Sequence, residues 1–187
     1  MDVVVSALAL VILSPLLALI ALAVRVSDDG PVLYRQTRVG LDGRRFTIIK
    51  FRTMQEHAER DLGAIWSVPN DPRCTALGQY LRRLGLDELP QLWNILRGEM
   101  SLVGPRPERP EFIREFRKDH RDYILRHVVR CGLTGYAQIH GWRGYTGVDE
   151  RLSHDLYYVR NWSLGLDFYI VLLTLIRGWS EKTRNGL

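Results

Sequence analysis

The amino-terminal part of the sequence is dominated by one run of apolar residues. No charged side chain occurs between Val3 and Val24, and Ser14 and Pro15 interrupt the run in its middle. The 22 residues of this run are enough for a helix to cross a hydrocarbon layer of roughly 30 Å. Proline removes a backbone hydrogen bond and collides with the preceding turn, so we predict a helix that bends at Ser14 and Pro15. The serine hydroxyl can hydrogen-bond to a carbonyl group that the bend leaves open.

Three arrangements of this segment compete: a re-entrant helix hairpin that returns to the same face of the bilayer, a single spanning helix and a cleavable signal peptide. A signal peptide is disfavoured because no basic residue precedes the run, which is also longer than a usual signal-peptide core. The central proline favours the re-entrant form. We expect the carboxyl end of the run on the cytoplasmic side, because basic residues follow it closely: Arg25, Arg35, Arg38, Arg44 and Arg45.

The pattern changes after residue 27 to short segments of alternating and helical periodicity. Alternation predicts strands at 32–34 and 45–51, on either side of a turn at 41–43. Helical spacing of apolar residues predicts helices over 76–84, from about Asp87 to Leu96, over 111–127 and over 149–161, and a polar helical pattern covers 54–62. The stretches 63–75 and 98–110 are rich in proline and are expected to be loops. With few and short strands, we predict a mainly helical α+β domain at 28–187 after a membrane helix at 1–27.

A second apolar stretch lies near the carboxyl end, at 164–176. It is too short to span a membrane and contains one charge, Asp167, while Trp162, Tyr169 and Trp179 lie around it. Amphipathic aromatic residues favour the headgroup zone, so this helix either lies in the membrane interface or packs in the core. The aromatic residues are also able to pack against a second copy, which keeps a homodimer open.

Composition narrows the range of partners. The net charge is +5, and 23 of the 26 cationic residues are arginine, whose planar group suits phosphate and carboxylate recognition. Lipid headgroups and nucleotide phosphates are therefore candidate partners, whereas nucleic acid is not expected because no recognition motif accompanies the charge. Cys74 and Cys131 are far apart and are expected to be free thiols, and five scattered histidines give no zinc-ligand spacing.

Two adjacent carboxylates, Asp87 and Glu88, are the strongest candidate for chemistry. One interpretation is structural, because acidic residues and Pro90 suit the first turn of a helix. The surroundings favour a functional interpretation: Arg82 and Arg83 precede the pair by one turn, and a carboxylate beside arginines is expected to stay ionised and nucleophilic. The second carboxylate can hold Mg²⁺, which uses few protein carboxylates together with phosphate oxygens.

Two further segments carry candidate phosphate binders. Lys50 and Arg52 end a predicted strand and, as alternate residues, are expected to project from the same face. Pro105, Arg106 and Pro107 form a rigid loop that holds an arginine in place. Both segments also have a plain structural interpretation, as solvated charges at a strand end and as an ordinary turn. Common nucleotide motifs are missing: the sequence has no Asp-x-Asp pair, no phosphate-binding P-loop and no Gly-x-Gly-x-x-Gly.

Taken together, these segments resemble the bacterial sugar transferase family, the monotopic phosphoglycosyl transferases. The resemblance covers nearly the whole chain and depends on the Ser14-Pro15 break and on five further segments in the family's order: Pro31–Gly40, Lys50–Met54, Leu86–Asn94, Met100–Pro107 and Gly132–Gln138. The carboxyl part, with Gly141-Trp142-Arg143-Gly144, is similar to the long members that start exopolysaccharide and O-antigen repeats, many of which use UDP-glucose or UDP-galactose.

The resemblance implies a re-entrant helix that places the active site on the cytoplasmic face of the bacterial inner membrane. It implies transfer of a sugar-1-phosphate from a UDP-sugar to undecaprenyl phosphate with release of UMP. By this analogy Asp87 is the nucleophile, Glu88 helps to hold Mg²⁺, and the Pro105-Arg106-Pro107 loop meets the nucleotide. Lys50, Arg52 and Arg83 are the expected phosphate binders.

Two other functions remain as alternatives. A conventional membrane-attached glycosyltransferase would transfer the sugar without its phosphate and release UDP. A non-catalytic module would bind acidic lipids through its arginines and turn over no nucleotide sugar.

Overall fold

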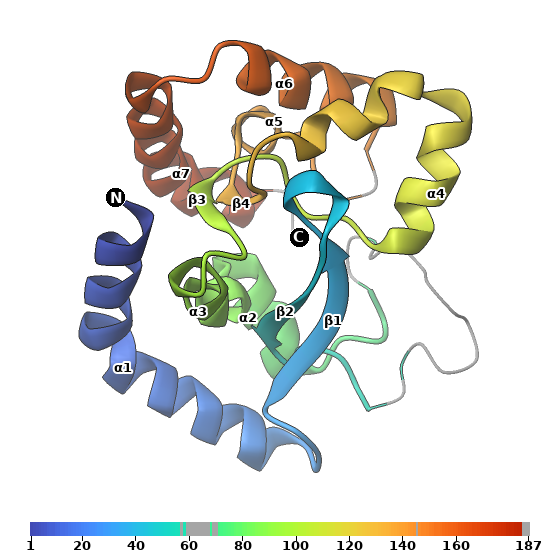
Figure 1. The fold of residues 1–187 in the computed structure, drawn as a ribbon. Coiled ribbons are helices and arrows are strands. Elements are labelled where there is room, and N and C mark those ends of the chain that lie inside the picture. The colour runs from blue at the N-terminus through green and yellow to red at the C-terminus, as the bar shows by residue number, and fades with distance from the viewer. Residues whose placement is uncertain (57, 59–67, 69–70, 145, 185–187) are drawn as a thin grey trace.

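The computed structural model describes residues 1–56, 58, 68, 71–144 and 146–184, with side chains as far as Ile176. It is mainly helical with few short strands, as predicted, and its strands form two small sheets (Figure 1). Strands β1 (Leu33–Val39) and β2 (Arg45–Phe51) form an antiparallel hairpin around a short 3₁₀ turn, η1 (Leu41–Gly43), and β3 (Ser101–Val103) pairs in parallel with β4 (Gly132–Thr134). The other elements are α1 (Asp2–Ser27), α2 (Ala76–Leu84), η2 (Leu86–Gln91), α3 (Leu92–Leu96), α4 (Pro110–Asp119), η3 (Arg121–His127), α5 (Tyr136–Ile139), α6 (Val148–Arg160) and α7 (Leu164–Arg184).

Helix α1 is continuous through Pro15, and Figure 1 shows that it bends in its middle. The Ser14 hydroxyl donates to the carbonyl of Val11 at 2.8 Å, as predicted for a serine beside a helix-breaking proline. In the described part of the chain, α1 is the one helix long and apolar enough to cross a membrane. Its outer face exposes large apolar side chains, while Ile20 and Val24 pack against the rest of the protein.

The hairpin has the predicted turn, but its first strand is longer than predicted. Strand β1 continues to Val39 and pairs along its whole length, from Leu33 opposite Phe51 to Val39 opposite Arg45. Residues 35–38 are polar or charged, so hydrophobic alternation did not indicate this part of the strand. Its backbone is held by pairing with β2, whose Ile48 and Phe51 are buried in the core.

The predicted helix over 111–127 is two elements. His120 has an extended backbone (φ −122°, ψ 93°), which ends α4 and starts η3 in a new direction. The break lets Ile113 of α4 and Tyr123 of η3 pack in one cluster with Val39 and Leu152.

Two other predictions need correction, and one cannot be assessed. The helix expected from about Asp87 begins as the 3₁₀ element η2, which contains Pro90, and becomes α-helical at Leu92. The expected loop over 98–110 contains β3. Most of the polar helix expected over 54–62 lies outside the described residues; at its start, Met54 forms a β-bridge with Cys74.

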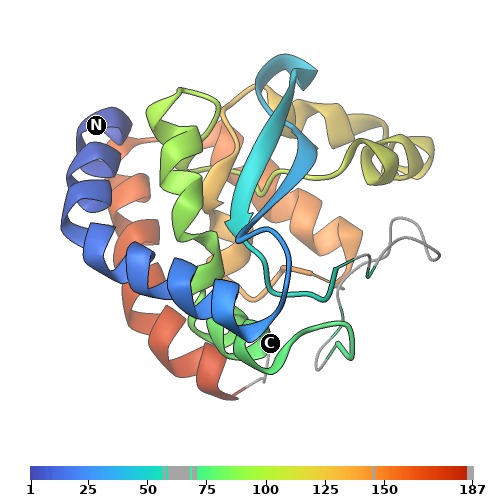
Figure 2. The ribbon, with the colours of Figure 1, turned by 90° about the horizontal axis from the view of Figure 1, so that it is seen from below.

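Helix α7 extends beyond the predicted 164–176, and one of its faces confirms the expectation of packing in the core. One face packs in the core, where Ile170 is fully buried with Val103, Ile139 and Tyr158. The other face exposes apolar and aromatic side chains: Leu164, Phe168, Tyr169, Leu172, Leu175 and Ile176. In Figures 1 and 2, α7 lies on the same side of the molecule as α1.

The buried His127 gives the fold a pH dependence. Burial, together with the adjacent Arg126, lowers the pKa of His127 from 6.5 to about 4. Between these values the unfolded chain binds more protons than the folded one, so the free energy of unfolding should rise with pH by on the order of 3 kcal/mol from this group. We expect His127→Asn to flatten the increase between about pH 4 and about pH 6.5, measured by urea unfolding in detergent. An unchanged slope in the variant would contradict this assignment.

Candidate active site

The carboxylate pair is placed by a sharp turn between two helices. Thr75 caps α2 by accepting a hydrogen bond from the Gly78 N–H at 2.9 Å. Gly85 ends α2 in the left-handed region (φ 69°), where a residue without a Cβ pays little strain. The chain then enters η2, which carries Asp87 and Glu88. The turn at Gly85 therefore sets the direction of η2 relative to α2.

The next helix is fixed to the hairpin by one buried side chain. The Asn94 Nδ2 group donates to the Thr47 carbonyl at 2.7 Å, and its Oδ1 accepts from the Ile49 N–H at 3.1 Å. Both partners lie on β2, the strand that carries Lys50. These hydrogen bonds therefore hold the end of β2 beside η2 and bring the predicted lysine to the predicted carboxylates.

Glu88 is the centre of an ion-pair cluster. Lys50 Nζ lies 2.7 Å from Glu88 Oε1, and Arg106 donates to both Glu88 oxygens, with Arg106 Nη1 at 3.2 Å from Oε2. Although burial opposes ionisation, Arg106 and Lys50 hold the pKa of Glu88 well below its usual range. Glu88 therefore favours its ionised form, and it holds the side chains of Lys50 and Arg106 in place.

Asp87 has a different environment from its neighbour. It is 7% exposed and, within the residues that the structure describes, forms no ion pair. Burial first, and then the Glu88 charge, raise the pKa of Asp87, against the smaller effects of Lys50, Arg82 and Arg106. The nearby cations act in the expected direction, towards the ionised form, but burial and the Glu88 charge oppose them. Its oxygens are left available for another partner.

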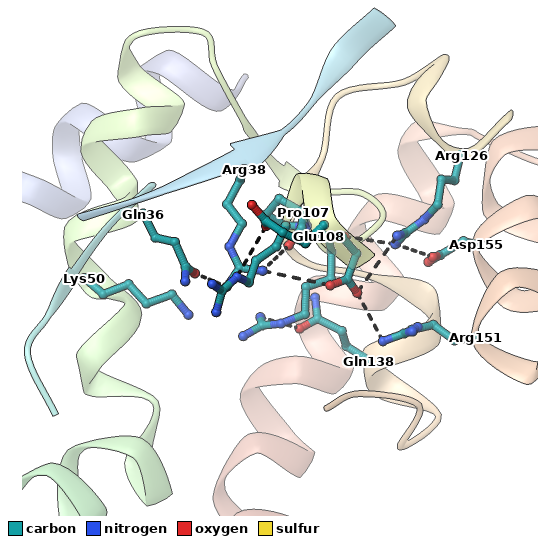
Figure 3. A network of polar contacts seen from close by, with 12 residues as sticks. Gln36, Arg38, Lys50, Pro107, Glu108, Arg126, Gln138, Arg151 and Asp155 are labelled. Atoms are coloured by element: carbon teal, nitrogen blue, oxygen red, sulfur yellow. Dashed lines mark hydrogen bonds and ion pairs between the residues drawn. The ribbon is translucent and has the colours of Figure 1, made fainter. Parts of the chain in front are cut away.

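The Pro105-Arg106-Pro107 loop is held along its backbone (Figure 3). Three successive carbonyls accept hydrogen bonds: Pro105 from the Gly132 N–H at 3.0 Å, Arg106 from Arg126 Nη2 at 2.9 Å, and Pro107 from Arg38 Nη1 at 3.2 Å. The Arg106 guanidinium also donates to Gln138 Oε1 at 3.1 Å. The arginine is therefore fixed at both its backbone and its side chain.

The structure separates Arg52 and Arg83 from the other predicted phosphate binders. Arg52 does not share a site with Lys50: its guanidinium donates to the carbonyls of Asp28 and Asp29 and so holds the turn after α1. Arg83 is exposed on α2, and it is Arg82 whose charge acts on Asp87.

Two residues near the site were not among the predictions. Arg38 lies on β1 and binds Gln36 Oε1 at 2.6 Å as well as the Pro107 carbonyl. Gln138 is identified as part of the site only by its hydrogen bond with Arg106 in the structure. Alternation along β1 would have placed Gln36 and Arg38 on one face, but only if the strand had been extended to Val39.

The carboxylate pair fits a magnesium ion that takes most of its ligands from elsewhere. No group of three or more potential ligand side chains occurs among the described residues. Mg²⁺ is usually held by one or two carboxylates together with water and substrate phosphates. Asp87 and Glu88 supply two carboxylates for such a site, and in this structure the Glu88 oxygens are bound to Lys50 and Arg106.

The fold and the site together define a protein with an apolar amino-terminal helix and an Asp-Glu pair whose Glu88 binds Lys50 and Arg106. The chain belongs to the bacterial sugar transferase family, whose sequence model matches residues 1–181.

Three curated relatives show the range of similarity. One from Escherichia coli (strain K12), named UDP-glucose:undecaprenyl-phosphate glucose-1-phosphate transferase, is 46% identical over 97% of this chain and 40% of its own length. A protein of that name from Caulobacter vibrioides is 44% identical over 94% of this chain and 67% of its own. The exopolysaccharide production protein PSS of Rhizobium leguminosarum bv. phaseoli is 39% identical over 98% of this chain and 94% of its own. The chain thus spans about two fifths of the Escherichia coli relative.

Proposed function

We propose that the protein is a phosphoglycosyl transferase that moves a hexose-1-phosphate from a UDP-sugar to undecaprenyl phosphate and releases UMP. The observation that carries this proposal is the meeting of Asp87 and Glu88 with Lys50 and Arg106 in a chain of this family. Several relatives are named for transfer of glucose-1-phosphate to undecaprenyl phosphate, and one for N-acetylgalactosamine phosphate. Glucose or galactose is the sugar that we favour.

In the proposed first step, the Asp87 carboxylate attacks the β-phosphorus of the UDP-sugar. The bond from that phosphorus to the bridging oxygen breaks, UMP leaves, and the sugar phosphate stays on Asp87 as a covalent aspartyl phosphosugar. Lys50 and Arg106 face the same carboxylate pair and would bind the phosphate oxygens. Asp87 and Glu88 would hold Mg²⁺, which supplies neutralisation of the phosphate charge and of the departing UMP.

In the second step, an oxygen of undecaprenyl phosphate attacks the phosphorus of the aspartyl phosphosugar. The bond to Asp87 breaks, the free carboxylate returns, and the lipid diphosphate sugar leaves. This order lets one site receive two phosphate-bearing substrates in turn. The two anions are therefore never bound together, and their mutual repulsion is avoided.

The packing of α1 supports access from the membrane. Leu86, the residue before Asp87, lies against the cluster formed by Ile20 and Val24 of α1 with Phe51 and Leu81. Asp87 is therefore one residue away from a cluster to which the apolar helix contributes two side chains. We propose that α1 is re-entrant, that α7 lies in the interface with its exposed apolar face, and that the site acts on the cytoplasmic face of the bacterial inner membrane.

The nucleotide product tests this function. The protein in lipid nanodiscs that contain undecaprenyl phosphate would be incubated with Mg²⁺ and either UDP-glucose, UDP-galactose or UDP-N-acetylgalactosamine, and the products separated by ion-exchange chromatography. We expect UMP from at least one donor. UDP as the product would indicate a conventional glycosyltransferase, and turnover of none of the three would favour a lipid-binding module.

A further inference from the structure

A cluster of buried charges lies behind the Pro105-Arg106-Pro107 loop (Figure 3). Its members come from separate elements: Arg126 from η3, Arg151 and Asp155 from α6, and Glu108 from the residue that follows the loop. Each of these four side chains is at most 6% exposed. The proposed mechanism uses none of them.

One guanidinium connects α6 to the loop. Arg126 Nη2 donates to the Arg106 carbonyl at 2.9 Å and lies 2.6 Å from Asp155 Oδ2. Its other terminal nitrogen, Nη1, donates to the Tyr123 hydroxyl at 2.8 Å. Asp155 therefore holds the Arg126 guanidinium by a buried ion pair, at the place from which Arg126 donates to the backbone of Arg106.

Glu108 fixes the other end of the loop. Its Oε1 lies 3.1 Å from Arg151 Nη1 and 4.0 Å from Arg126 Nη1, and its Oε2 lies 3.9 Å from Arg38 Nη1. Its backbone carbonyl accepts the Val39 N–H at 3.0 Å. Arg38 in turn donates to the Pro107 carbonyl, so the same cluster reaches the loop at two successive residues.

Buried ion pairs are poor devices for stability alone. Removing charges from water costs several kcal/mol per ion, and well-packed apolar residues often stabilise a core as much or more. What such a cluster does provide is a fixed place for each charged group, and the Arg126 hydrogen bonds to the Tyr123 hydroxyl and the Arg106 carbonyl add a preferred geometry. Here the cluster holds the backbone of Arg106, whose guanidinium binds both Glu88 oxygens.

We propose that Asp155 and Glu108 are positioning residues: acting through Arg126 and Arg38, they set the Arg106 guanidinium at the place where the donor phosphate binds. This inference rests on the proposed function, because it assigns Arg106 to the donor phosphate. It extends the site to α6, an element about 50 residues along the chain from the loop that it supports.

A double-mutant cycle tests the route through Arg106. Asp155→Asn keeps the size of the side chain but removes its charge, and we expect it to raise the KM for the UDP-sugar by about ten- to a hundredfold with the KM for undecaprenyl phosphate unchanged. In an Arg106→Ala background the same change should alter kcat/KM by less than about twofold, since the interaction it supports is already gone. Asp155→Glu, which restores the charge, should recover part of the donor KM.

A matched control separates positioning from loss of stability. Asp71 is also buried and lies 2.6 Å from an arginine, Arg73 Nη2, but in the segment before α2. Asp71→Asn should lower the melting temperature and leave the donor KM unchanged. If Asp155→Asn lowers kcat/KM equally with and without Arg106, or changes only the melting temperature, the proposal is wrong. Should Asp155→Asn fail to fold, Glu108→Gln replaces it in the double-mutant cycle with Arg106→Ala. The same two results, an equal loss of kcat/KM with and without Arg106 or a change in melting temperature alone, would then show that the proposal is wrong.

A measurement without substrate keeps this proposal separate from the proposed function. Amide hydrogen exchange of the peptide spanning 101–108 should be faster in Asp155→Asn than in Asp71→Asn, because the Arg106 carbonyl has lost its support. Unchanged exchange in Asp155→Asn would overturn the positioning role. If the wild-type protein releases no UMP, the proposed function fails, and the exchange result still decides whether α6 holds the loop.

Discussion

Replacement of Asp87 by asparagine is expected to abolish UMP release. The amide has nearly the shape of the carboxylate but no charge with which to attack phosphorus, so the covalent intermediate cannot form. We expect the rate to fall by a factor of about 10⁴ or more, as for other enzymes that lose their nucleophile. UMP release would be followed with a coupled assay, and intact-protein mass spectrometry would show whether a hexose phosphate adduct appears without lipid acceptor.

Asp42→Asn is the matched control for this prediction. Asp42 is exposed in the hairpin turn and has a left-handed backbone (φ 53°), a conformation that asparagine also accepts. The same loss of one carboxylate at that position should leave activity at the wild-type level. Turnover of Asp87→Asn at a tenth of the wild-type rate would show that Asp87 is not the nucleophile.

Substitution of Gly132 by alanine is expected to have the largest effect on stability. A Cβ at this position would lie 2.1 Å from the Gly104 nitrogen and 2.3 Å from the Thr134 carbonyl oxygen. Both are backbone atoms of the short β3–β4 region, which cannot move without shifting the loop that carries Arg106. We expect a loss of about 3 kcal/mol or more in the free energy of unfolding, measured by urea unfolding in detergent.

Gly165→Ala serves as the comparison for this change. A Cβ there meets only the Ser163 hydroxyl, at 3.9 Å, and the residue lies in the first turn of α7. Alanine favours helices over glycine, so the variant should be as stable as the wild type or up to about 1 kcal/mol more stable. A Gly132→Ala protein as stable as Gly165→Ala would contradict the close contact between the two short strands.

The sequence was a good guide to the parts of the site that have local signals. The apolar run with its central proline indicated α1, and two adjacent acidic residues at the start of a predicted helix indicated where the carboxylates lie. Lys50 and Arg106 were singled out from separate segments, and the structure brings both to Glu88. In each case the signal is a short motif whose side chains act close to their own element.

Features that depend on tertiary packing could not be predicted from the sequence. Arg151 and Asp155 lie four residues apart on a charged helix, a spacing typical of a solvated surface pair, yet both are buried. Arg52 looked like a partner of Lys50, but its position just past the end of β2 brings it to the turn after α1 instead. The raised pKa of Asp87 follows from burial, which neighbouring residue types do not reveal.

The central claim is that Asp87 lies where a nucleotide from water and a phosphate from the lipid layer can each reach it. The most direct measurement is peptide mapping by mass spectrometry, after the protein in nanodiscs without undecaprenyl phosphate has reacted with its UDP-sugar. The account predicts about one UMP released per protein, with one hexose phosphate on the peptide that contains Asp87, lost on addition of undecaprenyl phosphate. An adduct on another residue, or an adduct that the lipid phosphate does not remove, would contradict it.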